Sequence, residues 1–184
     1  MSRKRKLKSK IYEIEIESLS HEGRGISHND NKVIFTRGAL PGEKVIASRT
    51  LSRAKFEEAD VVEILKPSPD RIEAKCEVYG ICGGCSFQHL SSENQIAAKQ
   101  NWLQSAFMGQ GKAEPKNWLP PMQVQSWGYR RKARLGVRYV PKKEKVLVGF
   151  RERKSSFITV MSRCEVLHPS LGDNLEIIAE CIGK

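Results

Sequence analysis

Three of the five cysteines in this 184-residue chain are spaced closely enough to bind one metal centre. They form the motif C-x5-C-G-G-C and are Cys76, Cys82 and Cys85. The two glycines inside the motif let the backbone fold tightly and aim N–H groups at anionic sulfur. A fourth ligand must come from elsewhere, and Cys164 is the best candidate because its neighbours are typical of a loop. Cys181 lies among apolar residues of a final helix, which predicts a core thiol.

The spacing favours an iron–sulfur cluster without deciding between the possible centres. Structural zinc sites usually use two C-x2–4-C pairs, and the second pair is missing here. Free or redox-active thiols are the third reading. A radical-type cluster is not expected, because that chemistry uses a C-x3-C-x2-C loop. His89 follows the motif and is as readily a surface histidine as a ligand.

The net charge of +11 is concentrated in two stretches of the sequence. Residues 1–10 hold six Lys or Arg and no acid, whereas residues 129–154 hold eleven against two glutamates. Concentrated positive charge favours a polyanionic partner, most simply nucleic acid. A solvated face or a flexible tail is the alternative reading, and it is more plausible for residues 1–10.

Residues 129–140 show the clearest alternation in the chain, which predicts a strand with one apolar face and one cationic face. The apolar face is expected to carry Ala133, Leu135, Val137 and Tyr139. With partner strands at 146–150 and 157–160, this segment predicts an antiparallel meander. Cations on one face repel each other unless a polyanion sits there. The candidate RNA-binding residues are Arg130, Arg131, Lys132, Arg134 and Arg138, and the candidate base-stacking aromatics are Tyr12, Tyr129 and Phe150.

The elements around these motifs predict a mainly β fold with some helix. Residues 11–65 contain several short strand patterns, with a Pro41-Gly42 turn and no convincing helix, as in a small OB-like barrel. A helix is expected after the cysteine motif, with Ser92 and Gln95 as its capping box. Apolar residues at helical spacing predict an amphipathic helix over residues 170–184.

These patterns divide the chain into a basic arm at 1–10, a barrel at 11–66 and an α+β domain at 67–184. The second domain is expected to hold an antiparallel sheet and a cysteine-bound cluster. No apolar run is long enough for a membrane span, and no secretory signal precedes the barrel. Reduced cysteines fit the cytoplasm, so a cytoplasmic protein with no membrane partner is expected.

The ordered combination of these motifs resembles the bacterial 23S rRNA (uracil-5-)-methyltransferases of the RlmD (RumA) type. Gly23-x-Gly25 and residues 39–43 resemble its TRAM domain, an OB-like RNA-binding barrel. The sequence from Cys76 to His89 resembles the [4Fe–4S] loop of that family, and Cys164 matches the fourth ligand in place. Residues 128–135, 149–151 and 164–169 resemble the central RNA-binding domain.

The resemblance implies a 23S rRNA partner, a [4Fe–4S] cluster and, in the complete enzyme, S-adenosylmethionine. In that family a C-terminal Rossmann-like domain binds S-adenosylmethionine and carries a Cys nucleophile and a Glu base. We expect this chain to lack that domain, so it has no catalytic or S-adenosylmethionine-binding residue and is inactive alone. Cys181 has no matching motif and receives no nucleophile role. A monomer is expected.

Two other functions are compatible with the sequence. The first is a stand-alone RNA-binding module held together by zinc or a cluster, without catalysis. The second is a redox-sensing regulator that binds DNA, although no helix has the character of a recognition helix.

Overall fold

The computed structural model describes residues 10–111 and 113–183, so the predicted basic arm at 1–10 lies almost wholly outside the described residues. The chain forms two compact units. The first contains residues 1–72 and 89–118, and the second contains residues 73–88 and 119–184. Among the described residues, no helix is both long and apolar enough to cross a membrane.

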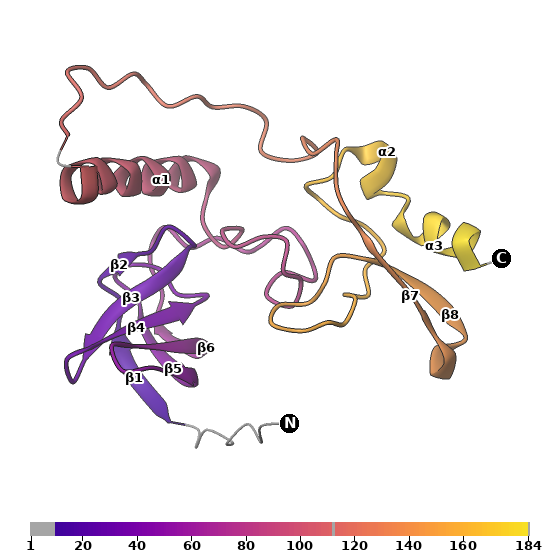
Figure 1. Ribbon diagram of the computed structural model, residues 1–184, viewed down its shortest axis with the longest axis horizontal. Helices are drawn as coiled ribbons and strands as arrows, with labels where there is room; N and C mark the ends of the chain where they lie inside the picture. The colour runs from indigo at the N-terminus through magenta and orange to yellow at the C-terminus, as the bar shows by residue number, and fades with distance from the viewer. Residues whose placement is uncertain (1–9, 112, 184) are drawn as a thin grey trace. The chain divides into compact units, whose positions relative to one another are not determined.

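The first unit is built on a curled six-stranded sheet that forms a half-barrel of the kind expected for an OB-like domain (Figure 1). Its strands are β1 (Ile11–Glu15), β2 (Ser18–Leu19), β3 (Arg24–Asn29), β4 (Lys32–Arg37), β5 (Lys44–Ser52) and β6 (Phe56–Lys66). The order in the sheet is β1-β5-β6-β4-β3-β2, and only the β4–β6 pair is parallel. Register shifts between β5 and β6 mark bulges, which bend a strand and help a sheet to curl.

Alternating side chains fill the barrel. In β1, Tyr12 and Ile14 are buried whereas Ile11, Glu13 and Glu15 face outward, as the alternation predicts. The buried cluster is Tyr12, Ile14, Ile16, Ile34, Ala39, Val45, Ala47 and Ala59. The turn after residue 40 depends on Gly42, whose φ of 78° favours glycine and whose N–H donates to the carbonyl of Ile16 at 2.8 Å.

A buried carboxylate joins the barrel to the segment that follows it. Glu43 has no exposed surface and accepts hydrogen bonds from the backbone N–H groups of Leu40 at 2.8 Å and Ser68 at 3.1 Å. Nε of Arg71 lies 2.6 Å from the same carboxylate. The residues that directly follow β6 are therefore fastened to the barrel.

Helix α1 (Ser92–Ala106) also belongs to the first unit and differs from its prediction in two ways. Its N-cap is Ser91, whose side chain accepts from the N–H of Asn94, one residue before the predicted capping box. None of its residues is buried, which the sequence did not indicate. A π-helical turn (Phe107–Gly111) follows it.

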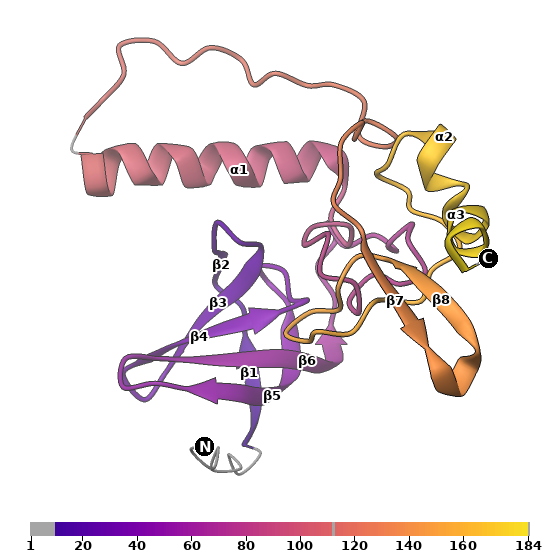
Figure 2. The same ribbon diagram turned by 45° about the vertical axis from the view of Figure 1, so that its right-hand side comes forward.

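The second unit contains the hairpin β7 (Gly136–Val140) and β8 (Lys145–Gly149), joined by a 3-10 turn (Pro141–Lys143). Two further helices are α2 (Pro169–Gly172) and α3 (Leu175–Gly183). Figures 1 and 2 both show α3 beside β8, and these two elements are in contact. The single helix predicted for residues 170–184 is wrong, since Asp173 and Asn174 separate two shorter helices.

Two glycines that pair across this hairpin leave room for a neighbouring side chain. Gly136 lies directly opposite Gly149, and a side chain at residue 136 would overlap Cδ1 of Ile158. The segment around Ile158 therefore packs directly on the hairpin backbone. One isolated bridge, between Arg151 and Ile158, joins this segment to the residues after the hairpin. The strand predicted at 157–160 is not formed.

Candidate metal centre and nucleic-acid interface

The four cysteines predicted to share a centre line one small cavity in the second unit. Cys76, Cys82, Cys85 and Cys164 surround it, together with Tyr79, Phe150 and Met161. Its free space of about 10 Å³ is at the lower limit of what one water molecule needs, so side chains fill most of the volume where the thiols converge. Cys181 is exposed and does not line this cavity, so the prediction of a core thiol is wrong.

Local hydrogen bonds shape the loop that carries the first three cysteines. The carbonyl of Cys76 accepts from the N–H of Tyr79 at 2.9 Å, which folds the chain back toward Cys82. The buried side chain of Gln88 accepts from the N–H of Cys76 at 3.0 Å, so the start and end of the motif are joined. The N–H of Gly84 lies 3.4 Å from Sγ of Cys82, as expected where glycines direct amides at sulfur.

A second segment runs along the cysteine loop and holds it in place. The N–H of Gly83 donates to the carbonyl of Arg151 at 2.9 Å, and Cys82 forms an isolated bridge with Glu152. A Cβ on Gly83 would come within 3.0 Å of that carbonyl oxygen. The glycine between Cys82 and Cys85 is thus needed for close approach of this neighbouring backbone.

Cys164 is positioned by the turn that leads into α2. Its N–H donates to the carbonyl of Gly172 at 2.9 Å, and a Cβ on Gly172 would lie 2.5 Å from the carbonyl oxygen of Cys164. The surrounding core contains Val166, Leu167 and Leu175. Close packing therefore holds the fourth thiol near a loop that lies some eighty residues earlier.

The thiols at this cavity disfavour one another's charge. Burial raises the pKa of Cys76, and negative charge on Cys164, Cys85 and Cys82 raises it further. Burial also raises the pKa of Cys82, against the lowering effect of the N–H of Gly84. Four thiolates at one site therefore need a compensating cation.

The donor set also limits which metal could bind. In the described part of the chain, no three His, Cys, Asp or Glu side chains stand close enough to share a single metal ion. Four thiols nevertheless line the same cavity. Thiolates around a four-iron cluster each bind a different iron, and so they stand farther apart than thiolates around one zinc ion. The structure therefore shows a cavity lined by four thiols and, among the described residues, no site for a single metal ion.

The basic segment does not form the strand predicted for it. Only residues 136–140 are in β7, and residues 131–135 are extended without a strand partner. The predicted apolar face is also wrong, because Val137 and Tyr139 are 52% and 58% exposed. A strand was predicted correctly for residues 136–140, whereas the earlier residues have no neighbouring strand to pair with.

The five predicted RNA-binding cations lie along this segment without ionic partners. Arg131, Lys132, Arg134 and Arg138 are exposed, whereas Arg130 is half-buried. Among the described residues, none of the five forms an ion pair with a carboxylate. Their charge is therefore available to an external anion.

The start of the basic segment is fastened to the cysteine centre. Arg130 forms a parallel bridge with Leu167, and its side chain lines the cysteine cavity. Of the predicted stacking aromatics, Tyr129 is exposed and Phe150 lines the same cavity. Tyr12 is only 4% exposed in the barrel core, so its prediction as a stacking residue is wrong.

Sequence reasoning missed residues whose roles depend on contacts between distant segments. Arg153 donates to carbonyls of the cysteine loop, and nothing in the spacing of the motif indicates a partner seventy residues away. Cations at one end of the barrel were missed as well, because they come from separate turns and no single stretch of sequence concentrates them.

Comparison with known proteins identifies the class first. A family model described as "TRAM domain" matches residues 5–62, a stretch that includes most of the half-barrel strands. A crystal structure of tRNA (uracil-54, C5)-methyltransferase from Pyrococcus abyssi, in complex with S-adenosyl-L-homocysteine, superposes with a TM-score of 0.61 at 24% identity. The superposition covers 91% of this chain and 35% of that protein, and it supports the fold. This stretch of the chain is thus similar to TRAM domains.

The particular relatives share one description, "23S rRNA (uracil(1939)-C(5))-methyltransferase RlmD". The protein from Vesicomyosocius okutanii is 66% identical over all 184 residues, and that from Alkalilimnicola ehrlichii is 48% identical over 180 residues. The chain spans about two fifths of their length, 42% and 40% respectively. Over its full length the chain is therefore related to the RlmD-type 23S rRNA (uracil-C5)-methyltransferases, which confirms the resemblance in its motifs.

Proposed function

We propose that this chain is the rRNA-binding portion of an S-adenosylmethionine-dependent 23S rRNA (uracil-C5)-methyltransferase in the cytoplasm. The observation that carries the proposal is the 66% identity to an RlmD protein over the whole chain. The methyl donor and the catalytic residues would belong to the part of the relatives' length that this chain does not span. The role of the chain itself is to bind a folded rRNA segment and present one uridine.

The basic segment is the proposed main contact with RNA. Its exposed cations are not neutralised by carboxylates of the described chain, so phosphates can bind them without first breaking an internal ion pair. Arginine also forms bidentate hydrogen bonds with phosphate, which fixes orientation as well as adding affinity. Tyr129, 52% exposed at the start of the segment, is suited to stacking on a splayed base.

We also propose that Cys76, Cys82, Cys85 and Cys164 hold a [4Fe–4S] cluster. Their shared cavity, the close spacing of the first three cysteines and the amide of Gly84 directed at Sγ of Cys82 support this assignment. With four protein thiolates the cluster would have no open coordination site, so its chemistry would be structural. It would join the 76–85 loop to residue 164 and to the start of the basic segment.

The RNA-binding proposal is tested by removing the exposed charges. The triple variant Arg131→Ala/Lys132→Ala/Arg134→Ala should bind a 23S rRNA fragment more weakly than the original chain. The slope of log affinity against log salt should flatten by about 0.7 for each single-strand phosphate that the variant no longer binds. Fluorescence anisotropy over a salt series measures both quantities.

The matched control is Arg131→Lys/Arg134→Lys, which keeps the positive charge and should keep the salt slope. An unchanged affinity in the alanine variant would rule out this segment as the RNA-binding surface. If the alanine and lysine variants show the same fall in affinity and in salt slope, charge does not explain the binding.

A further inference from the structure

One end of the half-barrel carries a concentration of cations that no single stretch of the sequence shows. An open cavity of about 270 Å³ lies there, lined by Lys10, Tyr12, Asn29, Asp30, Lys32, Ile34, Arg49, Ser52 and Glu57. The turn between β5 and β6 adds the exposed residues Arg53 and Lys55 beside it, since Ser52 and Glu57 pair at the base of that turn. We call Lys10, Lys32, Arg49, Arg53 and Lys55 the barrel rim.

A buried carboxylate organises the centre of this cavity. Glu57 is 5% exposed and accepts hydrogen bonds from Ser52 at 2.6 Å and from the hydroxyl of Tyr12. Its Oε1 atom also lies 3.3 Å from Arg49 and 3.5 Å from Lys32. Burial alone would raise the pKa of Glu57, but these hydrogen bonds and nearby cations hold that pKa at about 2.

Glu57 therefore stays charged and holds two cations of the rim side by side. Its acceptor positions are occupied by groups of the protein, so an incoming anion would not displace it. The rim holds five cations against the carboxylates of Glu57 and Asp30, which leaves a net charge of +3. Arg53 and Lys55 form no ion pair among the described residues.

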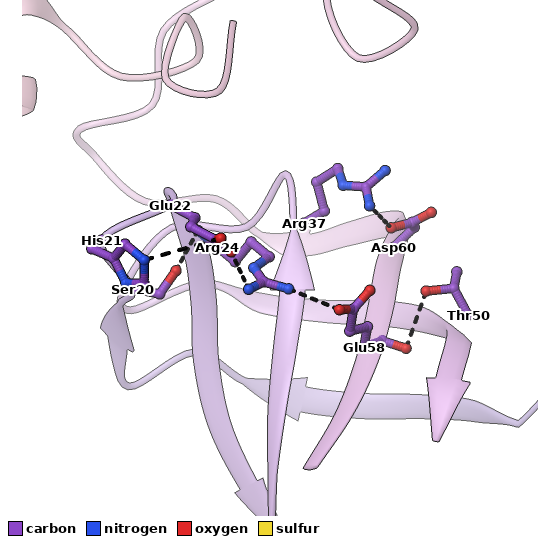
Figure 3. Close-up of polar contacts among 8 residues, drawn as sticks. All are labelled: Ser20, His21, Glu22, Arg24, Arg37, Thr50, Glu58 and Asp60. Atoms are coloured by element: carbon purple, nitrogen blue, oxygen red, sulfur yellow. Dashed lines mark hydrogen bonds and ion pairs between the residues drawn. The ribbon is translucent and has the colours of Figure 1, made fainter. Parts of the chain in front are cut away.

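With the exception of Lys66 at the end of β6, the described cations elsewhere on the barrel are each paired with a carboxylate. Figure 3 shows Arg24 bonded to Glu58, at 3.1 Å, and to Glu22. The same view shows Arg37 paired with Asp60 at 3.6 Å. Nζ of Lys44 lies 2.6 Å from Glu13 on the neighbouring strand β1. The excess of positive charge is therefore a property of the rim and is not general to the barrel surface.

We propose that the barrel rim binds consecutive backbone phosphates of an RNA strand, as a second contact beside the basic segment. Three uncompensated charges suit two or three phosphodiesters, each of which carries one negative charge. Phosphate contacts of this kind position the RNA without reading its sequence. This inference rests on the proposed function, because it assumes that the chain binds RNA.

The test compares two double variants that remove one arginine and one lysine each. Arg53→Ala/Lys55→Ala removes unpaired rim charges, whereas Arg37→Ala/Lys44→Ala removes paired charges and changes the net charge equally. Binding of a 23S rRNA fragment is measured by fluorescence anisotropy over a salt series. The rim variant should weaken binding severalfold and flatten the salt slope by about 1.4, at about 0.7 for each phosphate. The control should change affinity less than twofold.

Each outcome has a distinct meaning. Equal weakening in both variants would show a long-range effect of net charge and overturn the rim proposal. If the original chain binds RNA and the rim variant keeps its affinity and salt slope, the rim proposal fails while the proposed function stands. If the original chain itself does not bind RNA, the proposed function fails. Circular dichroism checks that each variant is folded. Arg53 and Lys55 are both exposed in a turn, where alanine is tolerated.

Discussion

Nε of Arg153 donates a hydrogen bond to the carbonyl oxygen of Cys82 at 3.0 Å, across seventy-one residues of sequence. Another nitrogen of the same guanidinium donates to the carbonyl of Cys85. The group also lies over the ring of Tyr79, 5.8 Å from its centroid. The side chain of Arg153 thus binds the backbone carbonyls of both cysteines that end the C-G-G-C loop.

Replacing Arg153 should therefore loosen the cysteine loop. Arg153→Met keeps much of the apolar stem and removes both donors, each of which contributes about 1.5–3 kcal/mol when the donor is charged. We expect less iron per chain and faster loss of visible absorption in air. Arg151→Met is the matched control, because the hydrogen bond of Arg151 to the loop comes from its backbone carbonyl. Equal iron contents in the two variants would contradict the role of Arg153.

The four cysteines should be individually required for the metal centre, whereas the fifth should not. Serine at residue 76, 82, 85 or 164 removes a ligand and should lower the iron and sulfide content of anaerobically purified protein. Cys181→Ser is the control, since Cys181 is exposed and does not line the cavity. A colourless protein that holds one zinc per chain would disprove the cluster.

The ion pair between Glu43 and Arg71 should be a major source of stability for the barrel. Glu43→Gln leaves Arg71 without its charged partner at a buried site, a change that typically costs about 3–5 kcal/mol. Urea unfolding at pH 7 measures this difference. Glu13→Gln is the control, because its pair with Lys44 is half exposed on both sides and should matter little.

The effect of Glu43 should also depend on pH. Burial acts to raise the pKa of Glu43, but the hydrogen bonds from Arg71, Leu40 and Ser68 leave it below the ordinary value of 4.5. A lowered pKa in the folded state gives stability that is fully present above pH 4.5 and is lost as the pH falls through the folded value. The difference between the original chain and Glu43→Gln should therefore shrink below pH 4.5. A difference that grows in acid would contradict this account.

Gly136 should not tolerate a side chain. Gly136→Ala would overlap Cδ1 of Ile158, and overpacking of this kind typically costs about 1–3 kcal/mol. Adding Ile158→Val removes the clashing atom and should recover part of the loss, which a double-mutant cycle measures. Gly109→Ala is the control, because nothing lies within 4 Å of the position that its Cβ would take. Equal stability of the two alanine variants would contradict the close packing of Ile158 on the hairpin.

The barrel strands could be predicted because their information is local. Alternation in residues 11–15 and the Pro41-Gly42 turn are visible in the sequence, and the structure has both. The strand at 129–135 could not be predicted correctly, because alternation shows which faces a strand would have but not whether a neighbour pairs with it. The break between α2 and α3 was missed for a similar reason, since the apolar spacing continues across Asp173 and Asn174.

The candidate site shows the same difference between local information in the sequence and contacts between distant segments. The cysteine motif is contiguous, so three of its four members could be found by spacing, and Cys164 followed from the need for a fourth ligand. The partners that position them could not be found, because Arg153 and Gln88 act through contacts that only the folded chain creates. The barrel rim was missed because Lys10 and Lys32 are far in the sequence from Arg49, Arg53 and Lys55 and lie near them only in the folded barrel.

The bridge between Arg130 and Leu167 has a consequence for RNA binding when the proposed cluster is missing. The backbone of Arg130, the first cation of the basic segment, is hydrogen-bonded to Val166 and His168, just beyond Cys164. A cell short of iron would then be expected to make a chain whose OB-like half folds normally but whose arginines no longer keep a fixed spacing. Such a chain would still attract RNA by charge while losing the ability to hold it in one orientation.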